Sequence, residues 1–396
     1  MLRTISLLFQ VAATLALLTN LPVRAADESS NPPVLARIGE RMEALVRDQE
    51  ISGAVTLVAT PDRIVHLEAN GLANIANHRP MRPDTIFWIA SMTKPTTATA
   101  MMMLQEEGKL SVEDLVSKYI PEFAGLKTVD GKPARITIRH LLTHTSGLAE
   151  FQRGQARKVR ILAEAIPYYI DRPVRYEPGS KWVYCQSGIN TAGRIIEIVS
   201  GTSLDRFLEK RLFGPLGMKD TAFYLNDEQA SRVAMTYDKK EGKLVPTEED
   251  LLAGRNPTHR DRFPAANGGL YSTAPDYARF CQMILNHGEL DGRRYLKPDS
   301  VEQMTSLQTA DLETGFTPGN GWGLGWCVVR HPQGITSMLS PGSFGHGGAF
   351  GTQAWIDPVK KRAYLLMIQR SNIGNSDRST VRQAFQEEAA SALGSQ

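Results

Sequence analysis

Apolar residues cluster in short runs near both ends of the chain and recur at helical spacing in the middle. Residues 53–59 and 64–69 predict two strands joined by a turn at Thr60-Pro61-Asp62. Apolar positions from about residue 136 to 285 favour helices. The C-terminal quarter predicts four more strands, separated by Gly, Pro and Asp turns: 324–329, 344–346, 352–356 and 363–368.

Several predicted helices have residues typical of helix ends. Thr137 is expected to cap a short helix, Gly201 to end one, and Gly214-Pro215 to end the helix that follows it. The stretch 238–262 is charged and contains few apolar residues, so it predicts a long loop or a weak hairpin. The longer predicted helices are 35–49, 93–107, 189–200, 204–212, 274–287 and 378–393.

This order of elements predicts an α/β fold of the α+β kind, in which the two ends of the chain build one sheet-containing part. That part is expected to comprise about residues 35–90 and 290–396, with a mostly helical part, about residues 91–289, inserted into it. Residues 26–396 are expected to form the whole of this domain.

The first 25 residues have the pattern of a signal peptide. Arg3 supplies the positive start, residues 5–18 are mostly apolar, and small residues surround a cleavage site near Ala25. Polar residues interrupt the apolar run, which falls short of the roughly 20 residues that a membrane span needs. We therefore expect export to the periplasm or the extracellular space without a stable membrane anchor.

Composition narrows the class of protein. Of 396 residues, 42% are hydrophobic and 22% are charged, as in folded globular proteins, and the net charge of +3 gives no electrostatic footprint for nucleic acid. The three cysteines leave at least one thiol unpaired within the chain, and we expect them to be buried apolar residues. The composition therefore leaves two classes of protein, an enzyme or a protein that binds small ligands.

The strongest candidate for chemistry is Ser91-Met92-Thr93-Lys94. A Ser and a Lys three residues apart at a helix start share one face, so the Lys94 amine can reach the Ser91 hydroxyl. A serine hydroxyl is a weak nucleophile until a neighbouring base takes its proton, and a desolvated lysine can be that base.

Two further segments fit such a site. Tyr184, in Tyr184-Cys185-Gln186, can relay a proton if it lies near the Ser–Lys pair. Residues 345–351 contain four glycines within a predicted strand, which indicates close approach of another backbone or a ligand. A strand edge at a cleft would offer N–H groups to a carbonyl oxygen.

Together these segments resemble the serine β-lactamase and penicillin-recognising superfamily, specifically its class C-like branch. That branch includes class C β-lactamases, family VIII carboxylesterases and D-amino-acid peptidases, and the S-x-x-K motif occurs in related enzymes. The resemblance covers about residues 35–390 and implies a mostly antiparallel central sheet flanked by helices. The matching stretches are Phe87–Leu110, Leu141–Leu148, Phe213–Met218, Gly268–Thr273, Gly323–Trp326 and His346–Pro358.

The resemblance also implies roles for individual residues. Ser91 would be the acylated nucleophile, Lys94 its partner and Tyr184 the general base or proton relay, and which of the last two takes the first proton stays open. The backbone N–H groups of Ser91 and Ala349 would form the oxyanion hole, with Gly348 on the same strand. No metal or other cofactor is implied.

Two departures from the family pattern bear on the substrate. Gln186 stands where the tyrosine motif usually ends in Asn, and this longer amide is expected to position substrate differently. His346 stands where class C β-lactamases carry the Lys of Lys-Thr-Gly. Because a histidine is mostly neutral above its reference pKa of about 6.5, it suits a β-lactam carboxylate less well than a lysine does.

We therefore expect an exported serine hydrolase that acts through an acyl-enzyme on small ester, amide or peptide substrates, foremost a carboxylesterase. The alternatives are a D-amino-acid peptidase or DD-carboxypeptidase, a weak class C-like β-lactamase, or a catalytically silent protein that binds peptidoglycan or peptide. The sequence leaves the oligomeric state open. His140 and His144 have the spacing of half a metal site, but no Glu or third ligand accompanies them, so a structural role is expected.

Overall fold

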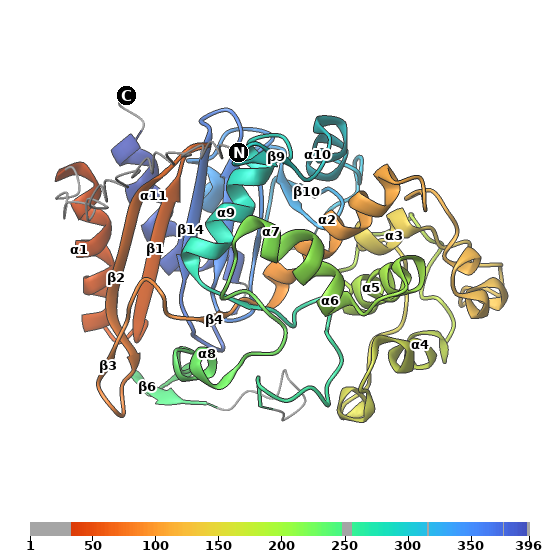
Figure 1. Ribbon diagram of the computed structural model, residues 1–396, viewed down its shortest axis with the longest axis horizontal. Coiled ribbons are helices and arrows are strands. Elements are labelled where there is room, and N and C mark those ends of the chain that lie inside the picture. The colour runs from red at the N-terminus through yellow and green to blue at the C-terminus, as the bar shows by residue number, and fades with distance from the viewer. Residues whose placement is uncertain (1–32, 248–255, 315–316, 375, 394–396) are drawn as a thin grey trace, which may run out of the picture.

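The computed structural model describes residues 33–247, 256–314, 317–374 and 376–393. Its centre is an eight-stranded sheet in the order β10-β11-β12-β13-β14-β1-β2-β3, and every neighbouring pair is antiparallel (Figure 1). The chain's two ends meet in this sheet where β1 pairs with β14, and Leu57 lies opposite Leu365. The strands are β1 Gly53–Ala59, β2 Ile64–Asn74, β3 Arg79–Pro80, β10 Asn320–Trp322, β11 Cys327–Val329, β12 Phe344–Gly347, β13 Gln353–Asp357 and β14 Arg362–Met367.

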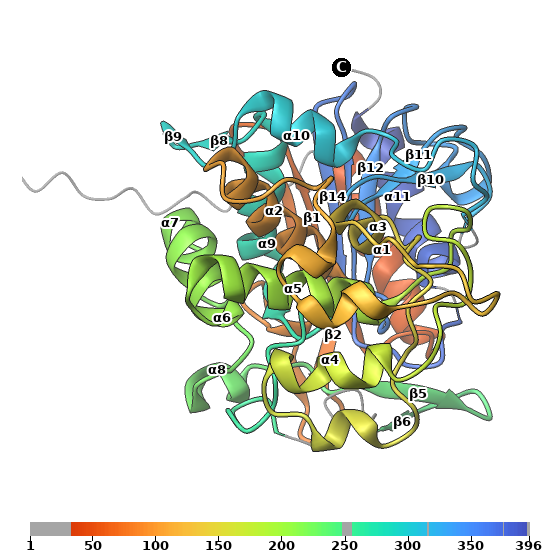
Figure 2. The same ribbon diagram turned by 90° about the vertical axis from the view of Figure 1, so that its right-hand side faces the viewer.

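Helices cover both faces of the sheet. Helices α1 (Pro33–Arg47) and α11 (Thr380–Leu393) pack against each other on one face, while α9 (Ala274–Leu285) covers the other face (Figure 2). Two apolar cores result from this arrangement. One lies between the sheet and α1 with α11, and the larger one extends from the opposite face into the helical part.

The helical part lies beside the sheet and faces the viewer in Figure 2. Helix α2 (Thr93–Glu106) belongs to this part and is largely buried. Of its 14 residues 12 are buried, and it packs on α5. The other helices are α3 Ile138–Leu142, α4 Leu162–Ile170, α5 Gln186–Ser200, α6 Leu204–Leu208, α7 Gly214–Leu216, α8 Asp227–Ser231 and α10 Pro298–Thr305. Two-stranded pairs are β4 (Phe87–Trp88) with β7 (Tyr271–Ser272), β5 (Tyr237–Lys240) with β6 (Lys243–Pro246), and β8 (Glu289–Leu290) with β9 (Arg293–Arg294).

The mostly antiparallel sheet flanked by helices confirms the predicted fold class. Thr137 caps α3 by accepting a hydrogen bond from the His140 N–H, and Gly201 ends α5 with a φ of 70°. The charged stretch after residue 237 forms the hairpin β5–β6 as far as residue 246, and residues 248–255 lie outside the described part.

Two boundary predictions were wrong. The chain stays helical through Gly214-Pro215, because a π-helical turn (Glu209–Phe213) leads directly into α7. Pro215 lies in the first turn of α7, where its missing N–H costs little, and Gly217 ends the helix instead with a φ of 71°. The predicted strand 324–329 begins only at Cys327, since Gly323–Trp326 form the turn between β10 and β11.

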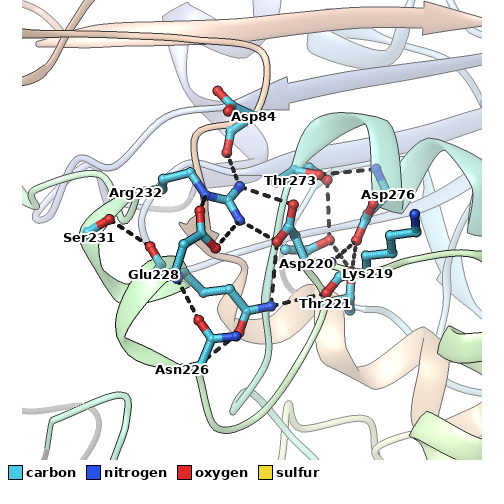
Figure 3. Close-up of polar contacts among 12 residues, drawn as sticks. Asp84, Lys219, Asp220, Thr221, Asn226, Glu228, Ser231, Arg232, Thr273 and Asp276 are labelled. Carbon is cyan, nitrogen blue, oxygen red and sulfur yellow. Dashed lines mark hydrogen bonds and ion pairs between the residues drawn. The ribbon is translucent and has the colours of Figure 1, made fainter.

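A network of polar side chains supports the short sheet β4–β7, which leads to the Ser–Lys motif (Figure 3). Asp276, in the first turn of α9, accepts hydrogen bonds from the Asp220 N–H at 2.7 Å and the Thr221 hydroxyl at 3.1 Å. The Thr221 hydroxyl also lies 2.7 Å from that of Ser272 in β7. Arg232 donates to the Asp220 carboxylate and, at 2.8 Å, to the Asp84 carbonyl. The segment 219–233 is therefore hydrogen bonded both to β7, through Thr221 and Ser272, and to the residues just before β4.

The cysteines and the apolar character of the helices can be compared with the sequence predictions. Cys185, Cys281 and Cys327 are free and buried, as predicted. None of the helices in the described part combines the length and apolar character of a membrane-crossing helix. The predicted signal peptide, residues 1–25, lies outside the described residues.

Candidate active site

Ser91 lies in a tight 3-10 turn (Ala90–Met92) between β4 and α2. The preceding residue, Ala90, has a φ of 44°, a left-handed conformation that costs energy in a residue with a Cβ. Hydrogen bonds hold the turn in this strained shape: the Ile89 N–H donates to the Leu270 carbonyl at 3.0 Å, and the Thr93 hydroxyl donates to the Ala90 carbonyl at 2.7 Å. The serine is therefore presented by a rigid junction.

Lys94 lies one helical turn further on and is completely buried. Its Nζ is 2.9 Å from the Ser91 Oγ and donates to the Asn267 carbonyl at 2.7 Å. Burial is the main cause that lowers the pKa of Lys94 from 10.5 to about 7, because a charged amine loses its hydration there. A large part of the amine is thus in its basic form near neutral pH, next to the Ser91 hydroxyl.

Tyr184 lies on the other side of Lys94, in the segment that leads into α5. The Lys94 Nζ is 4.6 Å from the centroid of the Tyr184 ring, and the Tyr184 hydroxyl is hydrogen bonded to the Ser91 side chain. Burial raises the pKa of Tyr184 above its usual value of 10, and the hydrogen bond with Ser91 opposes this shift. Near neutral pH Tyr184 is therefore a protonated phenol.

The glycine-rich end of β12 approaches the Ser91 turn closely. A Cβ on Gly348 would lie 2.5 Å from the Ile89 carbonyl oxygen and 2.1 Å from the Thr352 Oγ1, so only glycine fits here. This contact confirms the close backbone approach predicted from the four glycines. Ala349, the next residue, is exposed and lines the same cavity as Ser91.

His346 is buried in β12, and its ring centroid is 6.1 Å from that of Tyr184. Its Nδ1 is 2.7 Å from the Gly347 carbonyl oxygen. Burial, with a smaller contribution from the Lys94 charge, lowers the pKa of His346 from 6.5 to about 3. The ring is thus neutral near pH 7, and it is not among the residues that line the cavity beside Ser91.

Gln186 is the first residue of α5 and lines the cavity. Its Oε1 accepts a hydrogen bond from the Asn267 Nδ2 at 2.8 Å, and its N–H donates to the Glu150 carboxylate at 2.6 Å. The sequence did not reveal Asn267 and Glu150, because both lie just outside the matching stretches Leu141–Leu148 and Gly268–Thr273. Asn267 directly precedes the stretch Gly268–Thr273, and this neighbourhood was the available signal.

A cavity of about 340 Å³ opens beside Ser91. This volume is at the small end of the range of about 300–1,000 Å³ that is usual for ligand pockets. Its polar lining is formed by Ser91, Glu150, Gln186, Asn190, Arg262 and Asn267. Its apolar lining is formed by Trp88, Ala90, Phe151, Ala156, Phe263, Ala265 and Ala349.

The two histidines with metal-like spacing lie in different surroundings. His140 completes the cap of α3, where its Nδ1 accepts from the Thr137 N–H at 3.3 Å. His144 is fully buried next to Tyr184, with 4.5 Å between the ring centroids. Across the residues that the structure describes, no group of three or more His, Cys, Asp or Glu side chains is arranged to hold a metal ion.

Comparisons with known proteins identify the family of this chain. The family model described as Beta-lactamase matches residues 38–388. The chain is 34% identical to Protein Rv1367c of Mycobacterium tuberculosis (strain ATCC 25618 / H37Rv) over 353 residues, which is 81% of this chain and 86% of that protein. It is 28% identical to Esterase EstB of Burkholderia gladioli over 376 residues, which is 87% of this chain and 93% of the esterase.

A solved structure shares the fold. EstCE1, described as a hydrolase with promiscuous acyltransferase activity, superimposes with a TM-score of 0.78, covering 90% of this chain and 98% of its own, at 23% identity. At that identity the likeness shows the fold alone, and the family follows from the model match across residues 38–388 and from the 34% identity with Protein Rv1367c. The chain belongs to the Beta-lactamase family of serine hydrolases.

Proposed function

We propose that the protein is an exported carboxylesterase that works through an acyl-enzyme on Ser91. The observation that carries this proposal is the Lys94 amine, which is buried, 2.9 Å from the Ser91 Oγ, and has a pKa of about 7. Export rests on the signal-peptide pattern of residues 1–25.

In the first step, neutral Lys94 accepts the Ser91 proton while the Ser91 Oγ attacks the ester carbonyl carbon. Lys94 suits this role better than Tyr184, because the raised pKa of Tyr184 keeps the phenol protonated near neutral pH. The carbonyl π electrons move to oxygen and form a tetrahedral oxyanion, which the backbone N–H groups of Ser91 and Ala349 would stabilise.

In the second step, the oxyanion collapses and the bond to the alcohol oxygen breaks. Tyr184 donates its proton to the leaving alcohol and is reprotonated by Lys94, whose Nζ lies over its ring. Water then attacks the acyl-enzyme with the same base, the carboxylic acid leaves, and Ser91 regains its proton.

The surroundings of the site support a neutral substrate. His346, with a pKa of about 3, brings no positive charge to β12 at neutral pH. The cavity beside Ser91 is small and largely lined by aromatic and small apolar side chains. Neutral His346 leaves β12 without a cationic partner for a β-lactam carboxylate, and the apolar lining favours an ester with a small apolar group. Arg262 also lines the cavity, but it is buried and donates to the Phe223 carbonyl.

Parallel hydrolysis assays on purified residues 26–396 test the proposal. One assay uses p-nitrophenyl butyrate and the other a chromogenic cephalosporin, each with Ser91→Ala as the control. We expect ester turnover that disappears in Ser91→Ala, with little cephalosporin turnover. Fast cephalosporin turnover would identify a β-lactamase instead, and no turnover of either compound would favour a D-peptidase or a binding protein.

A further inference from the structure

We propose that His144 is a positioning residue for Tyr184: it holds the phenol in the orientation in which it donates to the leaving alcohol. This inference rests on the proposed esterase activity. His144 lies two residues after the end of the short helix α3, and it contacts the Tyr184 segment through both its backbone and its ring.

Two hydrogen bonds from His144 bracket Tyr184 on either side. The Val183 N–H donates to the His144 carbonyl oxygen at 3.0 Å, and the Cys185 N–H donates to the His144 Nδ1 at 3.1 Å. The residues immediately before and after Tyr184 are therefore held by one histidine. Because Cys185 also caps α5, the Tyr184 backbone is fixed between this histidine and the helix start.

The second of these hydrogen bonds defines the protonation state of the ring. Burial lowers the pKa of His144 well below 6.5, and the nearby Lys94 charge acts in the same direction. The neutral ring accepts at Nδ1, so its proton is on Nε2. His144 thus serves as a hydrogen-bond acceptor for the Tyr184 segment throughout the neutral pH range.

The ring of His144 also limits the movement of the Tyr184 ring. Their centroids are 4.5 Å apart with 42° between the planes, and Trp322 packs edge-on against His144 at 5.0 Å. Lys94 and His346 occupy two further sides of the Tyr184 ring, at 4.6 Å and 6.1 Å. In this enclosure the Tyr184 hydroxyl is directed at Ser91, to which it is hydrogen bonded.

The backbone of His144 supports a specific role for this position. Its φ is 60°, in the left-handed region that a side chain with a Cβ adopts at a cost. The strained conformation is what allows one residue to offer its carbonyl oxygen to Val183 and its Nδ1 to Cys185. Asparagine tolerates this backbone conformation and places an acceptor oxygen where Nδ1 now lies.

The test compares His144→Asn with His144→Leu, two side chains of similar shape of which only the first accepts a hydrogen bond. The substrates are ethyl butyrate, whose alcohol must be protonated on leaving, and p-nitrophenyl butyrate, whose phenolate leaves without a proton. We expect kcat/KM for the ethyl ester to fall about 10²-fold in His144→Leu and to stay within about fivefold of wild type in His144→Asn. The loss with the p-nitrophenyl ester is expected to be smaller, about tenfold, since Tyr184 matters less there.

Three controls separate positioning from a general loss of structure. His66→Leu removes another buried histidine, which pairs with the Thr56 hydroxyl at 2.9 Å in the sheet, and is expected to leave kcat/KM within twofold. In a Tyr184→Phe background, His144→Leu is expected to cause no further loss, because both changes act through one hydroxyl. If His144→Leu does not fold, His144→Asn alone decides. A kcat/KM within about fivefold of wild type supports the assignment of His144, and a larger loss contradicts it.

Equal losses in His144→Asn and His144→Leu would overturn the assignment of His144, as would equal losses for the two esters or additive losses with Tyr184→Phe. Wild-type protein that hydrolyses neither ester would overturn the proposed function itself, and the assignment of His144 with it.

Discussion

Replacing Lys94 by methionine is expected to stabilise the fold while abolishing most of the activity. Lys94 is fully buried, and its pKa falls from 10.5 to about 7. At about 1.4 kcal/mol per pKa unit, this difference corresponds to a cost of about 5 kcal/mol for keeping the amine charged in the folded state. Methionine has a similar shape and avoids that cost, but it leaves the Asn267 carbonyl without the Lys94 hydrogen bond, at about 1–3 kcal/mol.

The expected net gain in the free energy of unfolding is thus about 2–4 kcal/mol at pH 6.5. The gain in the free energy of unfolding depends on pH. Lys94 in the unfolded chain stays protonated up to pH 10.5, whereas the folded protein releases this proton above about 7, so wild-type stability rises between these values. The advantage of Lys94→Met is therefore full below pH 7 and falls to about zero near pH 9.

Activity is expected to change in the opposite direction. At pH 7.5 an amine with a pKa of about 7 is about three-quarters neutral, against about 0.1% for an unperturbed lysine, so burial supplies the base. We expect Lys94→Met to lower kcat/KM for p-nitrophenyl butyrate by about 10²–10⁴-fold. In the wild type, kcat/KM should rise with pH along a limb centred near 7, because protonated Lys94 cannot accept the Ser91 proton.

The assays are urea unfolding followed by circular dichroism at pH 6.5 and 9, and ester hydrolysis between pH 5.5 and 9. Lys94→Met that is less stable than wild type at pH 6.5, or that keeps more than a tenth of the activity, would refute the reasoning that links burial of this amine to its role as a base.

Three further predictions follow from the contacts around the site. Gly348→Ala should lower kcat/KM about 10²-fold, since the added Cβ would lie 2.5 Å from the Ile89 carbonyl oxygen and displace β12 from the Ser91 turn, while Gly125→Ala, where a Cβ meets no atom within 4 Å, should keep activity within twofold. Burial raises the pKa of Asp276 from 3.8 to about 6, so the stability that this carboxyl contributes is full below pH 3.8 and is lost by up to about 3 kcal/mol as pH rises through 6. Asp276→Asn should flatten this part of the stability curve in urea titrations, and an unchanged curve would contradict the explanation. Arg232→Ala should lower the free energy of unfolding by about 1–3 kcal/mol, because it removes the hydrogen bonds to Asp220 drawn in Figure 3. A change below about 0.5 kcal/mol would show that these hydrogen bonds do not stabilise the fold.

Most strands and the longer helices could be predicted from local pattern, because each depends on residues close in sequence. The antiparallel sheet itself came from the resemblance, since it pairs strands as far apart as β1 and β14. The Ser91–Lys94 pair is also local, since helical geometry alone brings two residues three apart onto one face. The roles of Tyr184 and Ala349 came from the resemblance, because no spacing rule connects these residues with Ser91.

Tertiary contacts decided what the local pattern could not predict. Asn267 and Glu150 reach the site through contacts with residues far away in the chain, such as the bond between the Asn267 carbonyl and Lys94 across 173 positions. The same reason explains why the strand predicted at 324–329 begins only at Cys327. Gly325 turns the chain there with a φ of 76°, and its N–H donates to the Leu142 carbonyl oxygen at 3.0 Å. The local pattern of apolar residues does not reveal this distant contact.

Ser91 is expected to carry the acyl group during turnover, and this can be examined by trapping the acylated protein. The measurement is mass spectrometry of protein quenched during turnover of p-nitrophenyl butyrate, followed by mapping of the modified peptide. We expect a mass increase of one butyryl group on Ser91 that is absent in Ser91→Ala. An adduct on another residue, or ester hydrolysis that persists unchanged in Ser91→Ala, would contradict it.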